Sequence, residues 1–439
     1  MDARQYFEGK KITVLGLGLL GRGVGDAHYL ASMGAELIIT DLKSKEELTE
    51  SLEKLAGFPN ITYTLGEHRI EDFRGRDFIL KAAGVPDPSV YLDAARAAGT
   101  PIKMSASWFA ELAGIPVIGI TGTRGKSTTT HMLHGILQAA GVPTLLGGNV
   151  RGVSTLSLLT EATPEHVALF ELDSWQLQGF GESKMSPHTA VFTTFFPDHL
   201  NYYHDDLDAY LSDKANIFLF QGPEDTFVLG RQCMELIEEK YQGCIKGQLA
   251  LVGNEDMPSG WKLRIPGAHA RYDAALALAA ARSMGINDEV SKAALEAFAG
   301  VPGRLEYVRE VDGVAVYNDT TATTPEATLA ALDALPAGNV VLIMGGADKG
   351  LDMDALLERI PAATKAVMLL EGTGTERIRA SLPGASVHGT LAAAVEAAFA
   401  IAEPGDTVLF SPAFASFGMF KNEYDRGDQF MALIKAYGA

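Results

Sequence analysis

Short apolar runs alternate with longer amphipathic, alanine-rich stretches along most of the chain. Continuous runs rich in β-branched residues are typical of strands buried on both faces of a parallel sheet, and the stretches between them are typical of covering helices. The pattern predicts strands at Lys11–Leu15, Glu36–Thr40, Phe78–Leu80, Pro116–Thr121, Val167–Glu171, Ala190–Thr194, Asn339–Met344, Ala366–Leu370 and Asp406–Phe410. The predicted fold class is therefore α/β.

Turn-rich segments divide this series into parts. At roughly 100–200 residues per domain, a chain of 439 residues suggests two to four domains. Glycine-rich turns follow the strands that end near residues 15 and 120, and each turn is expected to open its own sheet. A further turn, GVPG at 300–303, precedes a new series of strands. We predict three domains, at residues 1–113, 114–302 and 303–439.

Charge and cysteine content narrow the class of protein. The chain carries 36 Lys and Arg against 55 Asp and Glu, a formal net charge of −19, which disfavours general binding to nucleic acid. Its two cysteines, Cys233 and Cys244, fit neither a disulfide framework nor paired metal-ligand spacing. The first ten residues form no apolar signal region, and no stretch reaches the ~20 apolar residues of a membrane span. These features predict a soluble cytoplasmic protein with no membrane insertion.

The segment TGTRGKS at 121–127, between a predicted strand and a predicted helix, is the sharpest chemical signal. A glycine-rich turn at the start of a helix directs backbone N–H groups and the helix dipole at a phosphate. Lys126 would reach the β- and γ-phosphates, and the Ser127 hydroxyl would bind Mg²⁺. The strict pattern G-x-x-x-x-G-K-[ST] fails only because Ile120 stands at its first glycine. We expect an ATP site here.

A second glycine-rich turn, GLGLLG at 16–21, follows the first predicted strand, and Asp41 lies 20 residues beyond it. This spacing is that of a dinucleotide fingerprint, in which glycines approach a pyrophosphate and an acid meets a ribose. The motif by itself is weak. A nucleotide-sugar diphosphate would fit it as well as a nicotinamide would.

Polar residues also gather at other predicted strand ends. Glu171 ends one strand, Asp198 and His199 follow another, and Lys214 lies 15 residues beyond His199. Behind a phosphate loop, such carboxylate and imidazole groups could hold Mg²⁺ against a triphosphate. In the last third, NDTTATT at 318–324 follows the strand VAVY, and GGADK at 345–349 and SPAFAS at 411–416 follow two others. These three strand ends could hold a small anionic substrate, and Arg304 could reach a phosphate.

Taken together, these motifs resemble the Mur ligases of peptidoglycan synthesis over essentially the whole chain, with TGTRGKST, FELDSWQL, PDHLNYY, PGRLE, YNDTTATTPEAT, GGADKG and SPAFASFGMFKN as matching segments. The resemblance implies a Rossmann-like UDP-binding domain, a central P-loop ATPase-type domain and a C-terminal Rossmann-like domain that binds glutamate. It implies an ATP-dependent, acid–amino-acid ligase that adds glutamate to UDP-N-acetylmuramoyl-L-alanine through an acyl phosphate, acting as a monomer.

The resemblance also implies roles for individual residues. ATP binding falls on Gly122, Thr123, Arg124, Gly125, Lys126, Ser127, Thr128, Arg304, Asp319 and Asp273. The UDP-linked substrate falls on Gly18, Leu19, Leu20, Asp41, Asn149 and His199, and glutamate on Thr323, Lys349 and Ser416. The implied catalytic residues are Lys126, Lys214, His199 and Glu171. Two Mg²⁺ ions would be held by Ser127, Glu171, His199 and a carbamate formed from CO₂ on Lys214.

Several positions depart from the family pattern. Thr321 replaces a lysine, Gly303 replaces a histidine, His269–Asp273 reads HARYD where HNxxN is usual, and Glu423 and Tyr424 stand where an aromatic residue precedes an acid. These departures resemble a divergent branch in which some members add L-glutamate, so D-glutamate is preferred and L-glutamate remains an alternative.

Three other functional classes are weaker. A folylpolyglutamate synthetase-like ligase shares the phosphate loop but lacks the GLGLLG domain in front of it. A nicotinamide dehydrogenase leaves TGTRGKS and Asp198–His199 without a role. A non-catalytic nucleotide-binding regulator leaves the metal and phosphate residues unexplained.

Overall fold

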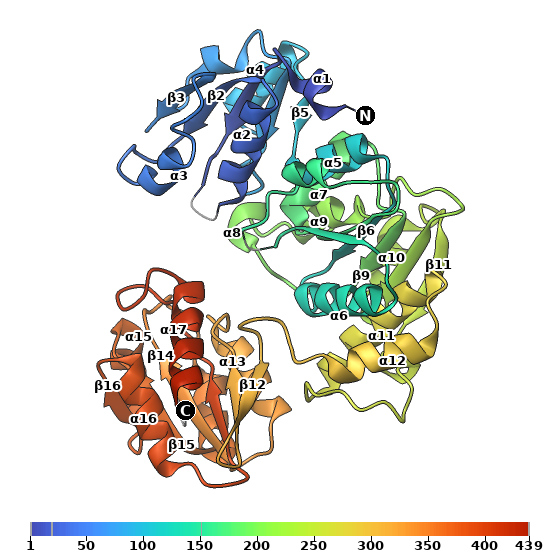
Figure 1. Cartoon of the computed structure of the whole chain (residues 1–439). Helices are drawn as coiled ribbons and strands as arrows, with labels where there is room; N and C mark the ends of the chain where they lie inside the picture. The colour runs from blue at the N-terminus through green and yellow to red at the C-terminus, as the bar shows by residue number, and fades with distance from the viewer. Residues whose placement is uncertain (1, 19–20, 151, 438–439) are drawn as a thin grey trace. The chain divides into compact units, whose positions relative to one another are not determined.

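The computed structural model describes residues 2–18, 21–150 and 152–437, and the side chains of all of these except 200 and 201. The chain divides into two compact units. Unit 1 comprises Met1–Pro258 and Asp273–Ala294, and unit 2 comprises Ser259–Tyr272 and Leu295–Ala439. Unit 1 contains two sheets and unit 2 contains one (Figure 1).

The first sheet of unit 1 has five parallel strands in the order β3-β2-β1-β4-β5. The strands are β1 (Lys11–Leu15), β2 (Glu36–Asp41), β3 (Ile61–Leu65), β4 (Phe78–Lys81) and β5 (Ile102–Lys103). Its helical segments are α1 (Ala3–Phe7), α2 (Arg22–Ser32), α3 (Thr49–Glu53), η1 (Ile70–Phe73), α4 (Val90–Ala97) and α5 (Ser105–Ala113). Strand order reverses between β1 and β4, and ligands of open α/β sheets bind beyond the carboxyl ends of strands at such a point.

The second sheet of unit 1 has six parallel strands in the order β11-β10-β9-β6-β8-β7. The strands are β6 (Val117–Thr121), β7 (Thr144–Gly148), β8 (Val167–Glu171), β9 (Thr189–Phe192), β10 (Thr226–Gly230) and β11 (Gln248–Val252). The helical segments are α6 (Lys126–Ala139), η2 (Leu156–Thr160), α7 (Ser174–Glu182), α8 (Leu200–Tyr203), α9 (Leu207–Ala215), η3 (Arg231–Cys233), α10 (Met234–Tyr241) and η4 (Asn254–Asp256). Most of α11 (Ala268–Ser283) and of α12 (Asp288–Ala297) also belongs to unit 1, while residues 268–272 and 295–297 belong to unit 2. Because β6 lies between β8 and β9, the segments that follow these three strands meet at one edge.

Unit 2 holds a six-stranded sheet in the order β12-β13-β17-β14-β15-β16, parallel except for the β12–β13 hairpin. The strands are β12 (Glu306–Val311), β13 (Val314–Asn318), β14 (Val340–Gly345), β15 (Thr364–Leu370), β16 (Ser386–His388) and β17 (Thr407–Phe410). The helical segments are α13 (Pro325–Ala334), α14 (Asp354–Ala363), α15 (Thr373–Ile378), η5 (Arg379–Ser381), α16 (Leu391–Ile401) and α17 (Glu423–Ala436). Helix α17 packs on α16 and on β13 (Figure 1).

The cores explain why these elements form. One hydrophobic cluster, packed against the second sheet, is rich in aromatic side chains that have no exposed surface, including Phe109, Phe170, Phe180, Phe192, Phe218 and Phe227. Beside the first sheet, Trp108 of α5 packs edge-on against Phe7 of α1 and tilted against Phe78 of β4. All nine strands predicted from apolar runs, and VAVY, are confirmed as parts of these sheets, and the α/β class is confirmed with them.

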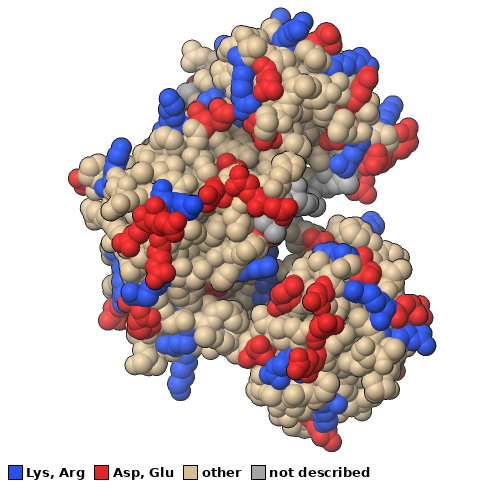
Figure 2. Space-filling view, turned by 180° about the vertical axis from the view of Figure 1, so that it is seen from behind, with Lys and Arg blue, Asp and Glu red and all other residues tan. Residues whose placement is uncertain are grey.

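Surface charge is mixed in sign. On the face shown in Figure 2, Lys and Arg side chains are scattered among acidic ones rather than gathered in one stripe. Within the described part of the chain, no helix combines the length and the apolar character needed to cross a membrane.

Candidate functional site

The TGTRGKS segment forms a tight loop between β6 and α6. Gly122 and Gly125 have φ values of 141° and 85°, and a Cβ on Gly122 would lie 2.0 Å from Thr193 Oγ1. The Thr123 N–H donates to the Thr194 carbonyl (2.6 Å), and the Arg124 N–H donates to Thr194 Oγ1 (2.9 Å). The segment after β9 therefore holds the loop, which opens directly into the first turn of α6, where backbone N–H groups bind anions.

Lys126 is the first residue of α6. Its ammonium group donates to the carbonyls of Gly122 and Thr123, both at 3.1 Å. The charge therefore lies over the loop, where it would meet phosphate oxygens. Ser127, the next residue, is buried, and the Arg124 side chain is exposed.

Asp273 on α11 lies under the same loop. It is 5% exposed, and its Oδ1 occupies the space that a side chain on Gly125 would need, 2.3 Å from such a Cβ. Burial raises the pKa of Asp273 well above its usual value, and hydrogen bonds from Thr128 and Thr129 oppose the shift. A carboxyl group that keeps its proton offers one O–H donor and an acceptor oxygen, whereas the amide expected at this position offers two N–H donors and one acceptor oxygen.

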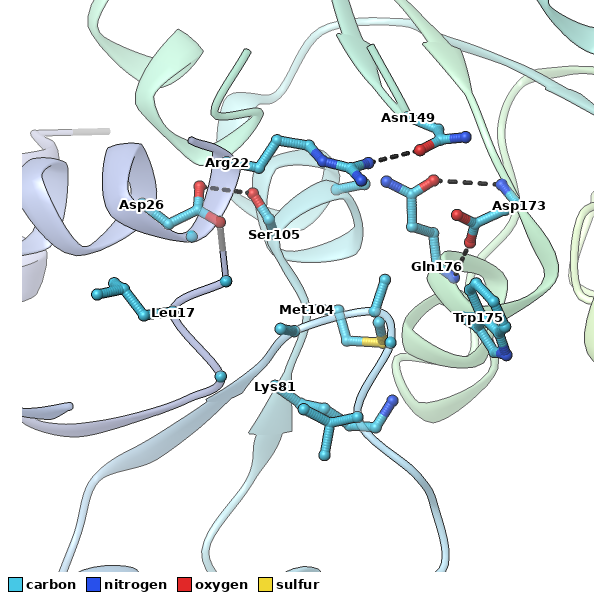
Figure 3. Close-up of a pocket in the computed structure, with 18 of the residues that line it drawn as sticks. Leu17, Arg22, Asp26, Lys81, Met104, Ser105, Asn149, Asp173, Trp175 and Gln176 are labelled. Atoms are coloured by element: carbon cyan, nitrogen blue, oxygen red, sulfur yellow. Dashed lines mark hydrogen bonds between the residues drawn. The ribbon is translucent and has the colours of Figure 1, made fainter. Parts of the chain in front are cut away.

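A chain of polar contacts runs from the first sheet of unit 1 to the second. The Arg22 guanidinium, on the first turn of α2, donates to Asn149 Oδ1 at 2.6 Å (Figure 3). Asn149 follows β7, and its Nδ2 faces Glu171 Oε1 at 3.5 Å, while its N–H donates to the Glu171 carbonyl at 2.7 Å. Glu171, at the end of β8, is 4% exposed. Arg22 thus fixes which side of the Asn149 amide faces this carboxylate.

His199 has a left-handed backbone (φ 53°), a conformation that for non-glycine residues clusters at functional sites. Its ring packs against Trp175 at 4.7 Å between centroids, and its Nε2 lies 3.9 Å from Asp198 Oδ2. Burial lowers the pKa of His199, Asp198 opposes the shift, and Lys126 and Lys214 reinforce it. The ring is therefore available as a neutral imidazole, the form that binds metals.

Lys214 on α9 is 1% exposed, and its ammonium donates to the Gly122 carbonyl at 2.8 Å. It also lies 4.9 Å from the centre of the Tyr210 ring. Burial, followed by the nearby charge of Lys126, lowers the pKa of Lys214 well below its usual value. The buried side chain of Lys214 thus contacts the glycine-rich loop through the Gly122 carbonyl.

The GLGLLG turn opens into a pocket of about 640 Å³ in unit 1. Asp41 holds the turn, because its Oδ2 accepts from the N–H groups of Leu17 (2.9 Å) and Gly18 (3.1 Å). Leu19 and Leu20, predicted to bind the UDP-linked substrate, lie outside the described residues. The pocket brings together one predicted residue from each glycine-rich turn, Gly18 and Lys126, with the predicted residues Asp41, Asn149 and His199 from other segments.

The predicted residues of unit 2 form their own group. Asp319 follows β13 and is 7% exposed, with its Oδ1 accepting from the Leu305 N–H (2.9 Å) and its Oδ2 from Ser411 Oγ (2.7 Å). Burial raises the pKa of Asp319 to about 7, against hydrogen bonds and the charge of Arg304. The side chain of Lys349 donates to Thr323 Oγ1 at 3.0 Å, which joins two predicted glutamate-binding residues. Ser416 is buried in the same unit.

Three charged residues of these sites were not predicted. Arg22 and Lys81 line the pocket of unit 1, and Arg426 on α17 is fully buried in unit 2. Arg426 donates to the Thr320 carbonyl (2.7 Å), to Thr320 Oγ1 (3.2 Å) and to the Phe414 carbonyl (3.1 Å). The sequence does show a charged residue at the end of an apolar strand (Lys81) and on an apolar helix face (Arg426). Such a pattern does not tell whether the charged side chain is exposed to solvent or buried in a site.

Few of the described side chains near the loop could hold the implied magnesium ions. No three His, Cys, Asp or Glu side chains of the described residues gather closely enough to hold a metal by themselves. Mg²⁺ at ATP sites is held by one or two protein oxygens together with phosphates and water, so such a cluster is not required. Ser127 beside the phosphate loop and the buried carboxylate of Glu171 supply oxygens of this kind, and the residues fit the ion on these terms.

Comparison with known proteins gives consistent matches. Residues 120–245 match the Mur ligase middle domain, and residues 303–414 match the Mur ligase, glutamate ligase domain. The chain is 38% identical to a UDP-N-acetylmuramoylalanine–D-glutamate ligase of Roseiflexus sp. (strain RS-1), over 98% of this chain and 99% of that protein. It is 33% identical to the protein of the same name from Borreliella afzelii (strain PKo), over 97% of each.

Solved structures share the fold. A UDP-N-acetylmuramate–alanine ligase from Thermotoga maritima is 21% identical, with a TM-score of 0.59 over 97% of this chain and 99% of that one. A MurF ligase from the same organism, solved with ADP, is 17% identical, with a TM-score of 0.59 over 91% and 94%. Because the relatives above 30% identity align with nearly the whole chain, the chain belongs to the Mur ligase family.

Proposed function

We propose that this chain is an ATP-dependent ligase that joins D-glutamate to UDP-N-acetylmuramoyl-L-alanine in peptidoglycan synthesis. The observation that carries the proposal is that Lys126 of the phosphate loop and the GLGLLG turn line one pocket. A nucleotide-linked acid in that pocket would reach a triphosphate on the loop. The names of the relatives, which are UDP-N-acetylmuramoylalanine–D-glutamate ligases, support both the UDP-linked substrate and D-glutamate.

The reaction requires activation of a carboxylate. The γ-phosphoryl group of ATP passes to the alanyl carboxylate, which gives an acyl phosphate and ADP. The glutamate amine then attacks the acyl carbon, phosphate leaves, and an amide and a proton result. Catalysis of phosphoryl transfer comes from positioning and charge neutralisation. Lys126 and the first turn of α6 supply positive charge on the triphosphate side.

The remaining residues of unit 1 orient these groups. Asn149, fixed by Arg22, places an amide N–H beside the pocket. Burial favours the protonated form of Asp273, and in that form it would add no negative charge under the loop and would not repel the triphosphate. Exclusion of water from the pocket would protect the acyl phosphate from hydrolysis.

Magnesium and a modified lysine belong to the same proposal. We assign two Mg²⁺ ions to Ser127, Glu171, His199 and Lys214, and when bound they supply charge neutralisation for the phosphoryl group. Lys214 can serve only as a carbamate, because hard cations prefer anionic oxygen ligands. The buried, hydrogen-bonded amine of Lys214, with its lowered pKa, supports this, since the neutral amine is the form that adds CO₂.

The substrates divide along the predicted domains. Residues 1–113 take the UDP group, 114–302 take ATP, and 303–439 take glutamate through Thr323, Lys349 and Ser416. Arg304 and Asp319 would contact the adenosine part of ATP. As part of the same proposal, the chain acts as a monomer in the cytoplasm, where ATP and UDP-linked precursors are available.

The test is ADP release from ATP, Mg²⁺ and UDP-N-acetylmuramoyl-L-alanine with D-glutamate, with L-glutamate, or with neither. We expect full turnover with D-glutamate and a product heavier by one glutamyl residue. Turnover with L-glutamate alone would support the other enantiomer, and no turnover with either would refute the proposal. Lys126→Ala should be inactive, whereas Lys240→Met, an exposed lysine paired with Asp208, should remain active.

A further inference from the structure

Lys81, at the end of β4, has no role in the reaction as proposed. Its side chain lines the pocket of unit 1 although the residue is only 2% exposed (Figure 3). The ammonium group donates to Gln178 Oε1 at 3.1 Å. An ammonium group has three N–H donors, and the described residues supply an acceptor for one of them. None of the described carboxylates lies within ion-pair distance of Lys81.

A buried cation without an anionic partner is costly, because its hydration is lost and nothing of opposite charge replaces it. Burial lowers the pKa of Lys81 to about 8, while Asp87, Asp213 and Asp173 raise it and Arg96 lowers it further. Lys81 therefore carries its charge at neutral pH. A fold that keeps a charge in this position is poised for an anionic ligand.

The surrounding carboxylates do not provide that anion. Asp213 accepts from Gln178 Nε2 (2.8 Å) and from the Tyr203 hydroxyl (2.9 Å), so an amide separates it from Lys81. Asp173 caps α7 by accepting from the Gln176 N–H at 2.8 Å. Asp87 accepts from both terminal nitrogens of the Arg96 guanidinium, at 2.9 and 2.7 Å. The three carboxylates whose charges act on Lys81 are thus held by other protein donors.

The substrate proposed for this pocket is itself an anion. UDP-N-acetylmuramoyl-L-alanine carries a diphosphate and a terminal carboxylate, both acceptors of charge-assisted hydrogen bonds. Lys81 precedes the segment 82–86, which also lines the pocket, as do Gly16–Gly18 of the neighbouring strand end. Its ammonium group lies where an acidic oxygen of a bound nucleotide sugar would complete its hydrogen bonding.

We propose that Lys81 is a substrate-binding residue that pairs with an anionic oxygen of the UDP-linked substrate, either of the diphosphate or of the alanyl carboxylate, and so determines affinity for it. The inference rests on the proposed function. Lys81 is not part of the phosphate loop, so ATP and glutamate are expected to bind independently of it.

Calorimetric titration of the full chain tests the proposal with three ligands: UDP, UDP-N-acetylglucosamine and UDP-N-acetylmuramoyl-L-alanine. Lys81→Met should raise the Kd of a ligand that contacts Lys81 by about ten- to a hundredfold, which is the effect of losing one charge-assisted hydrogen bond. Weaker binding of all three assigns the diphosphate, and weaker binding of the alanyl ligand alone assigns the carboxylate. Unchanged binding of all three would overturn the proposal.

Controls separate this role from a structural one. Lys103→Met removes a lysine of the neighbouring strand β5 that is paired with Glu111 at 2.6 Å, and should leave all three Kd values unchanged. Lys81→Arg keeps the positive charge and should retain most of the affinity for the UDP-linked ligands. This variant therefore tests the proposal even if Lys81→Met does not fold. The KM for ATP should stay constant in both variants of Lys81, and an equal rise in the KM of every substrate would refute a specific contact.

Failure of the proposed function gives a different result. If the wild-type chain shows neither turnover nor binding of UDP-N-acetylmuramoyl-L-alanine, the function itself is refuted. If the wild-type chain turns over and Lys81→Met binds the substrate equally well, only the role of Lys81 is refuted.

Discussion

Asp319 offers a quantitative test of how burial shapes the site in unit 2. The carboxyl group is enclosed after β13, and its pKa is raised by burial to about 7 from 3.8. The folded chain therefore keeps a proton on this group between about pH 4 and pH 7, where the unfolded chain has lost it. Stability from this group is fully present below pH 4 and is lost as the pH rises toward 7.

The size of the effect follows from the two pKa values. A separation of about three pH units, at about 1.4 kcal/mol each, costs the fold up to about 4 kcal/mol at pH 8. Asp319→Asn removes the ionisable group and keeps the contacts. The asparagine Oδ1 can accept from the Leu305 N–H, and its Nδ2 can donate to Ser411 Oγ, which donates onward to Thr328 Oγ1 (2.8 Å).

The assay is urea unfolding of the wild type and of Asp319→Asn between pH 5 and 8.5. Unfolding is monitored by hydrogen exchange in peptides from β13, so that unit 2 is observed directly. We expect the stability of Asp319→Asn relative to wild type to rise by about 1.4 kcal/mol per pH unit up to pH 7 and then to level off. Asp333→Asn, an exposed carboxylate of the same unit paired with Arg359, should show no such slope. Parallel profiles for wild type and Asp319→Asn would refute the reasoning.

Three further predictions concern the proposed sites. Lys214→Ala should be inactive and partly restored by acetate or formate, since the missing group is an anionic ligand; activity assays with and without the added acid decide, and absence of rescue would count against the carbamate. Lys349→Ala should raise the KM for glutamate by about tenfold and the KM for ATP less, because one charged hydrogen bond is lost; steady-state kinetics with the reverse pattern would relocate glutamate. Arg22→Met should lower kcat/KM by about tenfold or more, and its effect should not add to that of Asn149→Ala, because both break one contact; additive effects in the double variant would contradict this coupling.

The strands that sequence patterns predicted share one property. β1, β6, β14 and β17 are buried along nearly their whole length, so both faces are apolar and the run is continuous. The strands that were missed include the sheet edges β3, β11 and β16, which are mostly exposed or half-buried and show no such run. β5 has two residues and is too short for a pattern. The position of a strand at the edge of a sheet depends on the topology of the whole sheet. A short stretch of sequence therefore does not reveal it.

The candidate site also has a part that the sequence predicts and a part that it does not. The glycine-rich loop at 121–127 was predictable as a strand-to-helix turn because its glycines, Lys126 and the start of α6 are consecutive in sequence. The contact of Arg22 with Asn149 joins residues 127 positions apart, and that of Lys81 with Gln178 joins residues 97 apart. Nothing in either segment indicates its partner. Such pairs depend on the packing of two sheets, which no spacing within one motif encodes.

Buried charges in this fold differ in how completely the protein itself satisfies them, and that difference separates structural from functional residues. Arg426 and Lys81 are both buried, and neither has a carboxylate partner at ion-pair distance among the described residues. Burial lowers the pKa of Arg426 only to about 10, so it stays charged, and three protein acceptors hold its guanidinium to Thr320 and Phe414. Lys81 has one acceptor and faces a pocket. Since an unsatisfied charge is retained only where something compensates its cost, the fold explains Arg426, and the ligand proposed for the pocket would explain Lys81.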